Sequence, residues 1–330
     1  MQGLDFLANI FQEVWLYVVL SVVGFVVLIK FAEFFVDGAA SLARNFKIST
    51  AVVGLTIVAF GTSAPELAIS FNAHLAGNTD MMLGNVIGSN ITNLLVILGL
   101  ALLINPFKVE RSVVKKDMPI LVLITLGLSV LLLDNLLDFS KQNVLSRNDG
   151  IMLLLLFFVF VYYLITLLAN KENENGIQVE PKYKVLKSIV MTVLGLVGII
   201  IGSTLVVDNV SEFARSIGIS QKIIAVTVVS IGTSLPELVT TVIAAKKGEN
   251  DIAIGNIVGS NIFNTCIVLG LPIALLGDVV TTAFNLIDIM FMVFAAMMVW
   301  VFSLTGSFKR YQAVFLLLTY VAYIAYIVMQ

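Results

Sequence analysis

Apolar residues in this chain gather into blocks of roughly 20, and short polar stretches separate the blocks. An α-helix needs about 20 apolar residues to cross the hydrocarbon core of a bilayer, so each block is long enough to span it. The blocks are longer than strands and lack the alternating pattern of a membrane barrel, which leaves helices to satisfy the backbone hydrogen bonds. The sequence therefore predicts an all-α membrane protein with ten transmembrane helices, at 14–36, 50–73, 80–104, 117–135, 149–170, 185–207, 221–245, 251–275, 283–304 and 310–328.

The composition excludes other classes of protein. Only 12% of the 330 residues are charged and 59% are hydrophobic, whereas about 25% of a soluble domain is charged. Ten spans of about 22 residues use roughly 220 positions, so no soluble domain is expected. The formal net charge of −2 is too balanced to suggest nucleic-acid binding. The expected surroundings are the lipid bilayer, and no protein partner is implied.

The basic residues are distributed unevenly over the two sides of this ten-span arrangement. Of the 19 Lys and Arg, 14 fall on one side and four on the other, with Lys30 inside the first span. The positive-inside rule places the 14-residue side in the cytoplasm. We therefore expect a multi-pass protein of the cell (plasma) membrane with both termini outside.

The second half of the chain repeats the first at a constant offset. FGTSAPE at 60–66 returns as IGTSLPE at 231–237, and GNVIGSNITN at 84–93 returns as GNIVGSNIFN at 255–264, both shifted by 171 positions. Each half holds five predicted spans, so the second copy must enter the membrane from the opposite side, as in many secondary transporters. The predicted organisation is a five-helix repeat at 1–170, a short cytoplasmic linker at 171–184 and an inverted five-helix repeat at 185–330. A substrate site is expected near the midplane, between the repeats.

Two glutamates interrupt apolar blocks. Glu66 and Glu237 lie in the middle of the second and seventh blocks, where an ionised carboxylate costs at least about 2.5 to 3.5 kcal/mol. No Lys or Arg lies in the middle of either block to neutralise it. A cation from solution is the expected partner, the alternative being two protonated glutamates bonded to neighbouring helices.

The residues before each glutamate add further oxygens. Pro65 and Pro236 cannot donate a backbone hydrogen bond, so carbonyl groups one turn earlier should be partly freed. Two hydroxyl residues lie four and three positions before each glutamate and share its helix face: Thr62 and Ser63 in the first half, Thr233 and Ser234 in the second.

The third and eighth blocks each place a serine and an asparagine four positions apart, on one helix face. These residues are Ser89 and Asn93, and Ser260 and Asn264. Helix packing would explain them, but we expect cation ligation, with Gly88 and Gly259 serving both packing and the site. The collected ligands are oxygens without sulfur or imidazole, a set that suits a hard cation such as Ca²⁺ or Na⁺ better than Zn²⁺.

GTSAPE with GNVIGSN, and their second copies GTSLPE with GNIVGSN, resemble the signatures of the cation/calcium exchanger superfamily, in its sodium/calcium exchanger branch. The resemblance implies an antiporter, not an enzyme, that exchanges Ca²⁺ for about three Na⁺ by alternating access. The transported ions are its only implied ligands, with no cofactor. By position it makes Glu66 and Glu237 shared carboxylates for both ions, and it implies a sliding gate of the first and sixth helices. It further implies as ligands Thr62, Thr233, Ser63, Ser234, Ser89 and Ser260, and the backbone at Ala59 and Ser230 for Na⁺.

The chain departs from the family pattern in two places. Several prokaryotic and potassium-dependent members have Asp where this chain has Asn264, and the equivalent Asn93 is neutral too. The missing carboxylate argues against K⁺ cotransport and leaves proton/calcium exchange open, although proton exchangers usually show Gly-Asn-x-x-Glu in place of Gly-Thr-Ser-x-Pro-Glu. The linker is too short for the Ca²⁺-sensing domains of animal exchangers, so cytoplasmic Ca²⁺ regulation is not expected. A cation channel is a further alternative. An intramembrane protease is not expected, because GTSAP is not the GxSxG motif of a serine nucleophile.

Overall fold

The computed structural model describes residues 2–133, 143–169, 180–219, 230–281 and 286–329. Helices make up almost all of this part of the chain. In the first half they are α1 (Gln2–Phe46), α2 (Thr50–Val53), α3 (Ala59–Thr62), α4 (Ala64–Leu75), α5 (Thr79–Thr92), α6 (Leu98–Ile104), α7 (Met118–Leu131) and α9 (Arg147–Ala169). In the second half they are α10 (Val185–Ser216), α12 (Ser230–Thr233), α13 (Leu235–Lys246), α14 (Asn250–Phe263), α15 (Gly270–Leu276), α16 (Leu286–Ser303) and α17 (Arg310–Met329).

Wider π-helical turns continue several of these helices. They are η1 (Gly54–Val58), between α2 and α3, η2 (Asn93–Ile97), between α5 and α6, η3 (Val113–Asp117), before α7, and η5 (Asn264–Leu269), between α14 and α15. One short antiparallel sheet lies outside the helices and pairs β1 (Asn143–Leu145) with β2 (Val279–Thr281). The sheet is a small departure from the predicted all-α architecture, formed where β-branched residues fall in connections between helices.

Seven helices in the described ranges are long and apolar enough to cross a membrane, and the pair α3 and α4, bent by 45°, adds an eighth span with α2 and η1. This confirms a helical, multi-pass membrane protein. Two of the ten predicted spans are not among the eight. The block at 117–135 is helical as far as Leu131, but the turn that leads into it carries two lysines and an aspartate. For the block at 221–245, residues 220–229 lie outside the described ranges.

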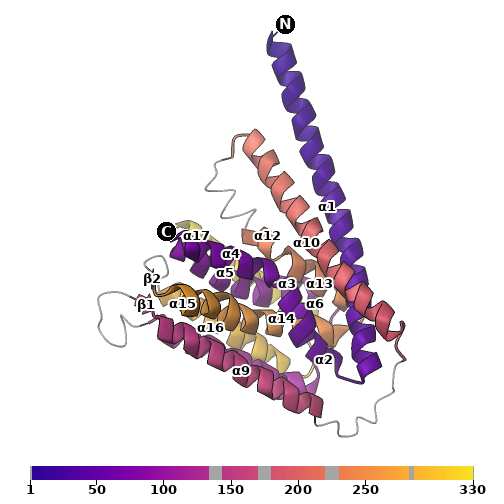
Figure 1. Cartoon of the computed structure of the whole chain (residues 1–330), viewed down its shortest axis with the longest axis vertical. Helices are drawn as coiled ribbons and strands as arrows, with labels where there is room; N and C mark the ends of the chain where they lie inside the picture. The colour runs from indigo at the N-terminus through magenta and orange to yellow at the C-terminus, as the bar shows by residue number, and fades with distance from the viewer. Residues whose placement is uncertain (1, 134–142, 170–179, 220–229, 282–285, 330) are drawn as a thin grey trace.

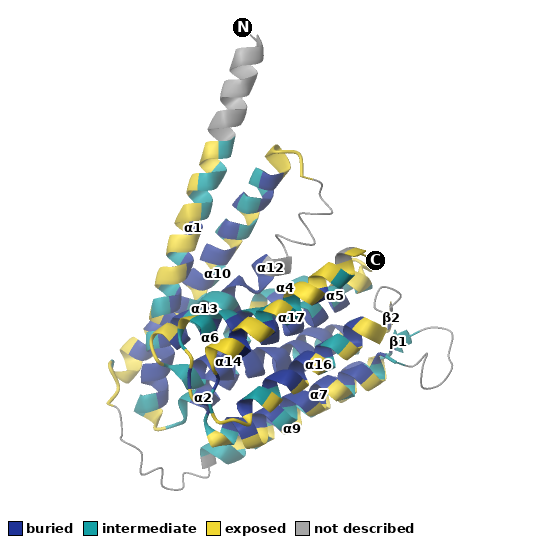
Figure 2. Ribbon diagram, turned by 180° about the vertical axis from the view of Figure 1, so that it is seen from behind, coloured by how far each residue is buried: buried dark blue, intermediate teal, exposed yellow. Residues whose placement is uncertain are grey.

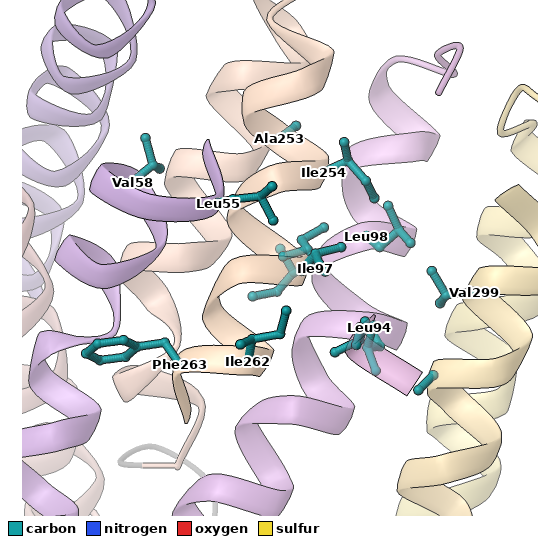
Figure 3. Close-up of a cluster of buried hydrophobic side chains, with 14 of the residues drawn as sticks. Leu55, Val58, Leu94, Ile97, Leu98, Ala253, Ile254, Ile262, Phe263 and Val299 are labelled. Carbon is teal, nitrogen blue, oxygen red and sulfur yellow. The ribbon is translucent and has the colours of Figure 1, made fainter. Parts of the chain in front are cut away.

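The buried core joins the two halves of the chain. Figure 2 shows buried residues on the inner faces of the helices, whereas the part of α1 that extends away from the bundle carries mostly exposed and intermediate ones. Figure 3 shows the centre of this core, where Leu55 and Val58 of η1 and Ile97 of η2 surround Ile254 and Ile262 of α14, all of them buried. Because α14 is buried from residue 252 to residue 263, it forms the central element against which both halves pack.

Helices α1 and α10 lie side by side along one flank of the bundle (Figure 1). Glycines let their backbones touch: a Cβ atom at Gly195 would lie 2.6 Å from the backbone nitrogen of Phe35, and one at Gly202 would lie 2.7 Å from that of Leu28. Small residues of this kind allow close helix packing in membranes. We infer that α1 and α10 behave as one paired unit.

The Gly195→Ala substitution is expected to lower the thermal unfolding midpoint of the detergent-solubilised protein, because the added methyl group overlaps the backbone of Phe35. Overpacking of this kind costs about 1 to 3 kcal/mol. Gly127→Ala is the matched control, since its Cβ atom would lie 3.9 Å from the nearest atom, Cδ1 of Leu156. The two midpoints, measured by differential scanning fluorimetry, should separate; equal midpoints would mean that the α1–α10 contact tolerates a wider spacing.

Ion pairs hold the C-terminal end of α1 to the bundle. Asp37 pairs with Lys247 at 2.5 Å and with Lys182 at 2.8 Å, and Arg44 pairs with Glu249 at 2.6 Å. Such partly exposed pairs contribute at most about 1 kcal/mol each. The attachment at this end is therefore polar and can be broken at modest cost.

Candidate functional site

Each of the two glutamates lies in the first turn of a helix that begins after a break. Helix α3 ends and α4 begins around Ser63, with φ −86° and ψ 6°, and α12 and α13 meet in the same way at Ser234, with φ −88° and ψ 7°. A proline occupies the first turn of α4 and of α13, where its missing N–H group is tolerated. Both halves therefore have a helix break just before the proline. It places Glu66 and Glu237 at the positive ends of the two half-helices.

The glutamate side chains are buried, and most of their oxygens lack hydrogen-bond partners. Each residue is 1% exposed. Oγ of Ser63 donates to Oε1 of Glu237 at 2.8 Å, which links the first half of the chain to the second. Both carboxylate oxygens of Glu66 and Oε2 of Glu237 have no partner among the described residues.

Two buried aspartates of the same bundle, unlike the glutamates, accept hydrogen bonds from tyrosine hydroxyl groups. Oδ1 of Asp117 accepts a hydrogen bond from the hydroxyl of Tyr163 at 2.6 Å, and Oδ1 of Asp288 accepts one from Tyr323 at 3.2 Å. A buried carboxylate is costly unless it is paired or hydrogen-bonded. The glutamate pair therefore stands out as the buried carboxyl groups that the described residues leave mostly without hydrogen-bond partners.

Helices α5 and α14 and the turns that follow them carry further predicted oxygen ligands. The wide turns η2 and η5 begin at Asn93 and Asn264, two positions related by the offset of 171. Both asparagines are buried, and the amide nitrogen and oxygen of each have no partner among the described residues. π-helical turns of this kind are frequent at functional sites because they displace a side chain from the regular helical register. Ser89 and Ser260 are buried one turn earlier, with Oγ of Ser260 3.5 Å from the carbonyl oxygen of Ala59.

The structure shows the packing of Gly259, but only part of the surroundings of Gly88 and Ser230. A Cβ atom at Gly259 would lie 2.6 Å from the carbonyl oxygen of Leu55 and 2.7 Å from Cβ of Ala59, so this glycine lets α14 pack directly on η1 and α3. Gly88 holds the equivalent position in α5, but the segment expected to oppose it, 220–229, lies outside the described ranges. Ser230 begins α12 at the edge of that segment, and its side chain is not described.

Two asparagines that the sequence reasoning missed contact the same half-helices. Nδ2 of Asn85 donates to the carbonyl oxygen of Glu66 at 3.2 Å and to Oγ of Ser70 at 2.9 Å. Nδ2 of Asn256 makes the equivalent contacts, to the carbonyl oxygen of Glu237 at 3.5 Å and to Oγ1 of Thr241 at 2.9 Å. These three pairs of positions also differ by 171, so the repeat extends from the sequence to the hydrogen bonds. The signal was present in the sequence, because the Gly-Asn that opens each second motif recurs at that offset.

The remaining predicted residues are buried too: Thr62, Thr233 and Ser234. Hydroxyls of the first half thus bond to a carboxylate and a carboxamide of the second, at Ser63–Glu237 and Thr62–Asn256, and the two glutamates carry a formal charge of −2 when both are ionised. Among the described residues there is no group of three or more His, Cys, Asp or Glu side chains that could hold a metal ion. A hard cation, bound by two carboxylates and neutral oxygens, matches this set better than a transition metal.

Comparisons with known proteins agree with this arrangement. A family model described as "Sodium/calcium exchanger protein" matches residues 16–166 and 187–329, one segment in each half. The inner membrane protein YrbG of Escherichia coli (strain K12) is 37% identical over 261 residues, which are 77% of this chain and 78% of that protein. The sodium/calcium exchanger MaX1 of Methanosarcina acetivorans is 32% identical over 337 residues, covering 91% of this chain and 95% of its own. The solved structure of the sodium-calcium exchanger NCX_Mj, soaked with 10 mM Na⁺ and zero Ca²⁺, matches with a TM-score of 0.83 and 29% identity over 94% of this chain and 99% of that one.

Proposed function

Because this chain belongs to the sodium/calcium exchanger protein family, we propose that it exchanges Ca²⁺ for Na⁺ across the membrane by alternating access. It is a multi-pass membrane transporter, not an enzyme. The observation that carries the proposal is the pair of buried glutamates, one in each broken helix: both carboxylate oxygens of Glu66 and one of Glu237 lack protein partners in the described ranges. Two carboxylates match the charge of one Ca²⁺, which an occupied site would neutralise.

Both ions compete for this site in our proposal. Glu66 and Glu237 serve as shared carboxylates, and the neutral oxygen ligands are those of Thr62, Thr233, Ser63, Ser234, Ser89, Ser260, Asn93 and Asn264, with the backbone at Ala59 and Ser230 and close approach at Gly88 and Gly259. Two carboxylates together with several neutral oxygens fit Ca²⁺, which takes six to eight oxygen ligands in flexible geometry. An empty site would leave two buried charges unpaired, so the transition between sides should be slow without a cation.

The proposed architecture has ten spans in two inverted repeats, 1–170 and 185–330, joined by a cytoplasmic linker at 171–184, with both termini outside the cell membrane. The glycine contact between α1 and α10 supports their role as a sliding gate, because paired helices can move together across the bundle. The ion pairs of Asp37 with Lys247 and Lys182 would break and re-form at the linker side during this movement.

The energetics favour about three Na⁺ per Ca²⁺. Against a roughly ten-thousand-fold Ca²⁺ gradient and about 100 mV, export costs about 5.6 kcal/mol for concentration and about 4.6 kcal/mol for two charges. One Na⁺ entering down a roughly tenfold gradient returns about 1.4 plus 2.3 kcal/mol. Two Na⁺ return too little and three return enough.

The proposal is tested by ⁴⁵Ca²⁺ uptake into proteoliposomes loaded with Na⁺, K⁺ or choline, with the proton gradient imposed or collapsed by an ionophore. We expect uptake only with internal Na⁺, unaffected when the proton gradient collapses. Uptake that follows the proton gradient without Na⁺ would assign the chain to proton/calcium exchange. Uptake in choline without either gradient would indicate a channel.

A further inference from the structure

We propose that Asn256 is a positioning residue that turns the hydroxyl of Thr62 so that its lone pairs, and not its hydrogen, face the cation. The inference rests on the proposed function, since it concerns how the same site is prepared for its ion. Asn256 lies outside the predicted ligand set, and it links the ligand Thr62 of the first half to the helix of Glu237 in the second half.

The contacts of Asn256 fix the orientation of its amide group. The residue is completely buried. Its Nδ2 atom lies 2.9 Å from Oγ1 of Thr241 and 3.5 Å from the carbonyl oxygen of Glu237. A backbone carbonyl can only accept, so the amide nitrogen must face α13 and the amide oxygen must face the opposite way. That oxygen, Oδ1, lies 3.1 Å from Oγ1 of Thr62.

Asn85 supports this orientation from the other half of the chain. Its Nδ2 atom contacts the carbonyl oxygen of Glu66 at 3.2 Å and Oγ of Ser70 at 2.9 Å. The same amide geometry therefore recurs at both equivalent positions, which is unexpected for an incidental packing contact. In each half the asparagine holds the first turn of the helix that carries the glutamate.

A hydroxyl group has one hydrogen and two lone pairs, so it binds a cation only when its hydrogen points elsewhere. Beside a carboxylate the hydrogen is drawn to the negative charge, as the bond from Ser63 to Oε1 of Glu237 demonstrates. The Glu237 carboxyl group also interacts with the Thr62 hydroxyl, and Oδ1 of Asn256, at 3.1 Å, competes for the Thr62 hydrogen with that group and with the carbonyl oxygen of Ala59 at 3.3 Å. With its hydrogen committed to Asn256, Thr62 has lone pairs ready for the ion before the ion arrives.

The experiment is a double-mutant cycle of Asn256→Ala and Thr62→Val, read by ⁴⁵Ca²⁺ uptake against Na⁺ in proteoliposomes. Thr62→Val keeps the shape of threonine and removes its hydroxyl. We expect each single variant to raise the apparent KM for Ca²⁺ about tenfold, with the maximal rate changed less than about threefold, a loss of the size expected for one buried hydrogen bond. The double variant should be no worse than the worse single one, because both remove the same oriented ligand.

Asn105→Ala is the matched control. Nδ2 of Asn105 donates to the carbonyl oxygen of Ala245 at 2.7 Å, so this variant also removes an amide-to-carbonyl contact to α13, but two turns from Glu237. Its KM for Ca²⁺ should stay at the wild-type value. Asn256→Ser keeps a small acceptor and should recover part of the affinity, which guards against a variant that simply folds poorly.

Additive losses in the double variant, or a fall in maximal rate with unchanged KM, would overturn the inference and leave Asn256 a structural residue. Glu237→Gln is measured in the same series to separate the two proposals. If Glu237→Gln transports normally, the proposed site itself is wrong. If it abolishes exchange while Asn256→Ala behaves like Asn105→Ala, only the positioning role fails.

Discussion

Glu66→Gln and Glu237→Gln are each expected to lower Ca²⁺ exchange at least about a hundredfold. Glutamine has the shape of glutamate without its charge, so the variant site offers one negative charge to a divalent ion. Removing one partner of a buried charge pair costs about 3 to 5 kcal/mol, which corresponds to a factor of more than a hundred. Uptake of ⁴⁵Ca²⁺ into Na⁺-loaded proteoliposomes, normalised to reconstituted protein, measures the loss.

Glu249→Gln is the control for the same chemical change outside the site. Glu249 pairs with Arg44 at the end of α1, where its side chain is 18% exposed. The loss of one such pair costs at most about 1 kcal/mol, so this variant should keep most of its transport. Wild-type rates in Glu66→Gln or Glu237→Gln would remove the central claim of the proposed function.

A stability measurement separates loss of the site from loss of the fold. In buffer without Na⁺ or Ca²⁺, Glu66→Gln should unfold at a higher temperature than the wild type, because it removes a buried charge whose oxygens have no partner in the described ranges. Added Ca²⁺ should stabilise the wild type by mass action and leave the variant nearly unchanged. A variant that is less stable than the wild type without ions, and still responds to Ca²⁺, would contradict the assigned role of Glu66.

The repeat explains why so much of this site could be predicted from the sequence. A single Thr-Ser-x-Pro-Glu stretch is compatible with an ordinary proline kink, but the copies at Glu66 and Glu237 share one offset. The structure has the same break at Ser63 and Ser234 and wide turns that begin at Asn93 and Asn264. Local features of this kind can be predicted from the sequence, since a proline or a mid-span carboxylate affects the backbone and the residues next to it.

The hydrogen bonds between distant segments could not be predicted from the sequence. The bond from Ser63 to Glu237 crosses 174 positions, and the one from Thr62 to Asn256 crosses 194. The residue pattern of a single helix does not show which other helix packs against it. The repeat marks Asn256 in the sequence, but its contacts with Thr62 and with the carbonyl oxygen of Glu237 appear only in the structure. The length of α1 was also missed, since a helix of 45 residues extends well beyond the predicted span at 14–36.

Asn264→Asp is expected to change which ions support exchange. Asn264 is fully buried at the start of η5, and neither atom of its amide group has a partner among the described residues. An aspartate there would give the site three carboxylates. With Ca²⁺ bound, the charge would be −1 in place of zero, and a buried unpaired charge opposes movement through the membrane. Ca²⁺ exchange should therefore fall at least about tenfold when no further monovalent ion or proton can bind.

The same charge count predicts what restores transport in Asn264→Asp. K⁺ or a lower pH should recover Ca²⁺ exchange in the variant and leave the wild type unaffected, because one monovalent ion or one proton neutralises the added carboxylate. Asn78→Asp is the control, since Asn78 caps the N-terminus of α5 near the surface and aspartate caps a helix equally well. An unchanged dependence on Na⁺, K⁺ and pH in Asn264→Asp would show that position 264 does not face the ion. In that case Asn264, and by symmetry Asn93, would not be ligands, and other groups would surround the ion beside Glu66 and Glu237.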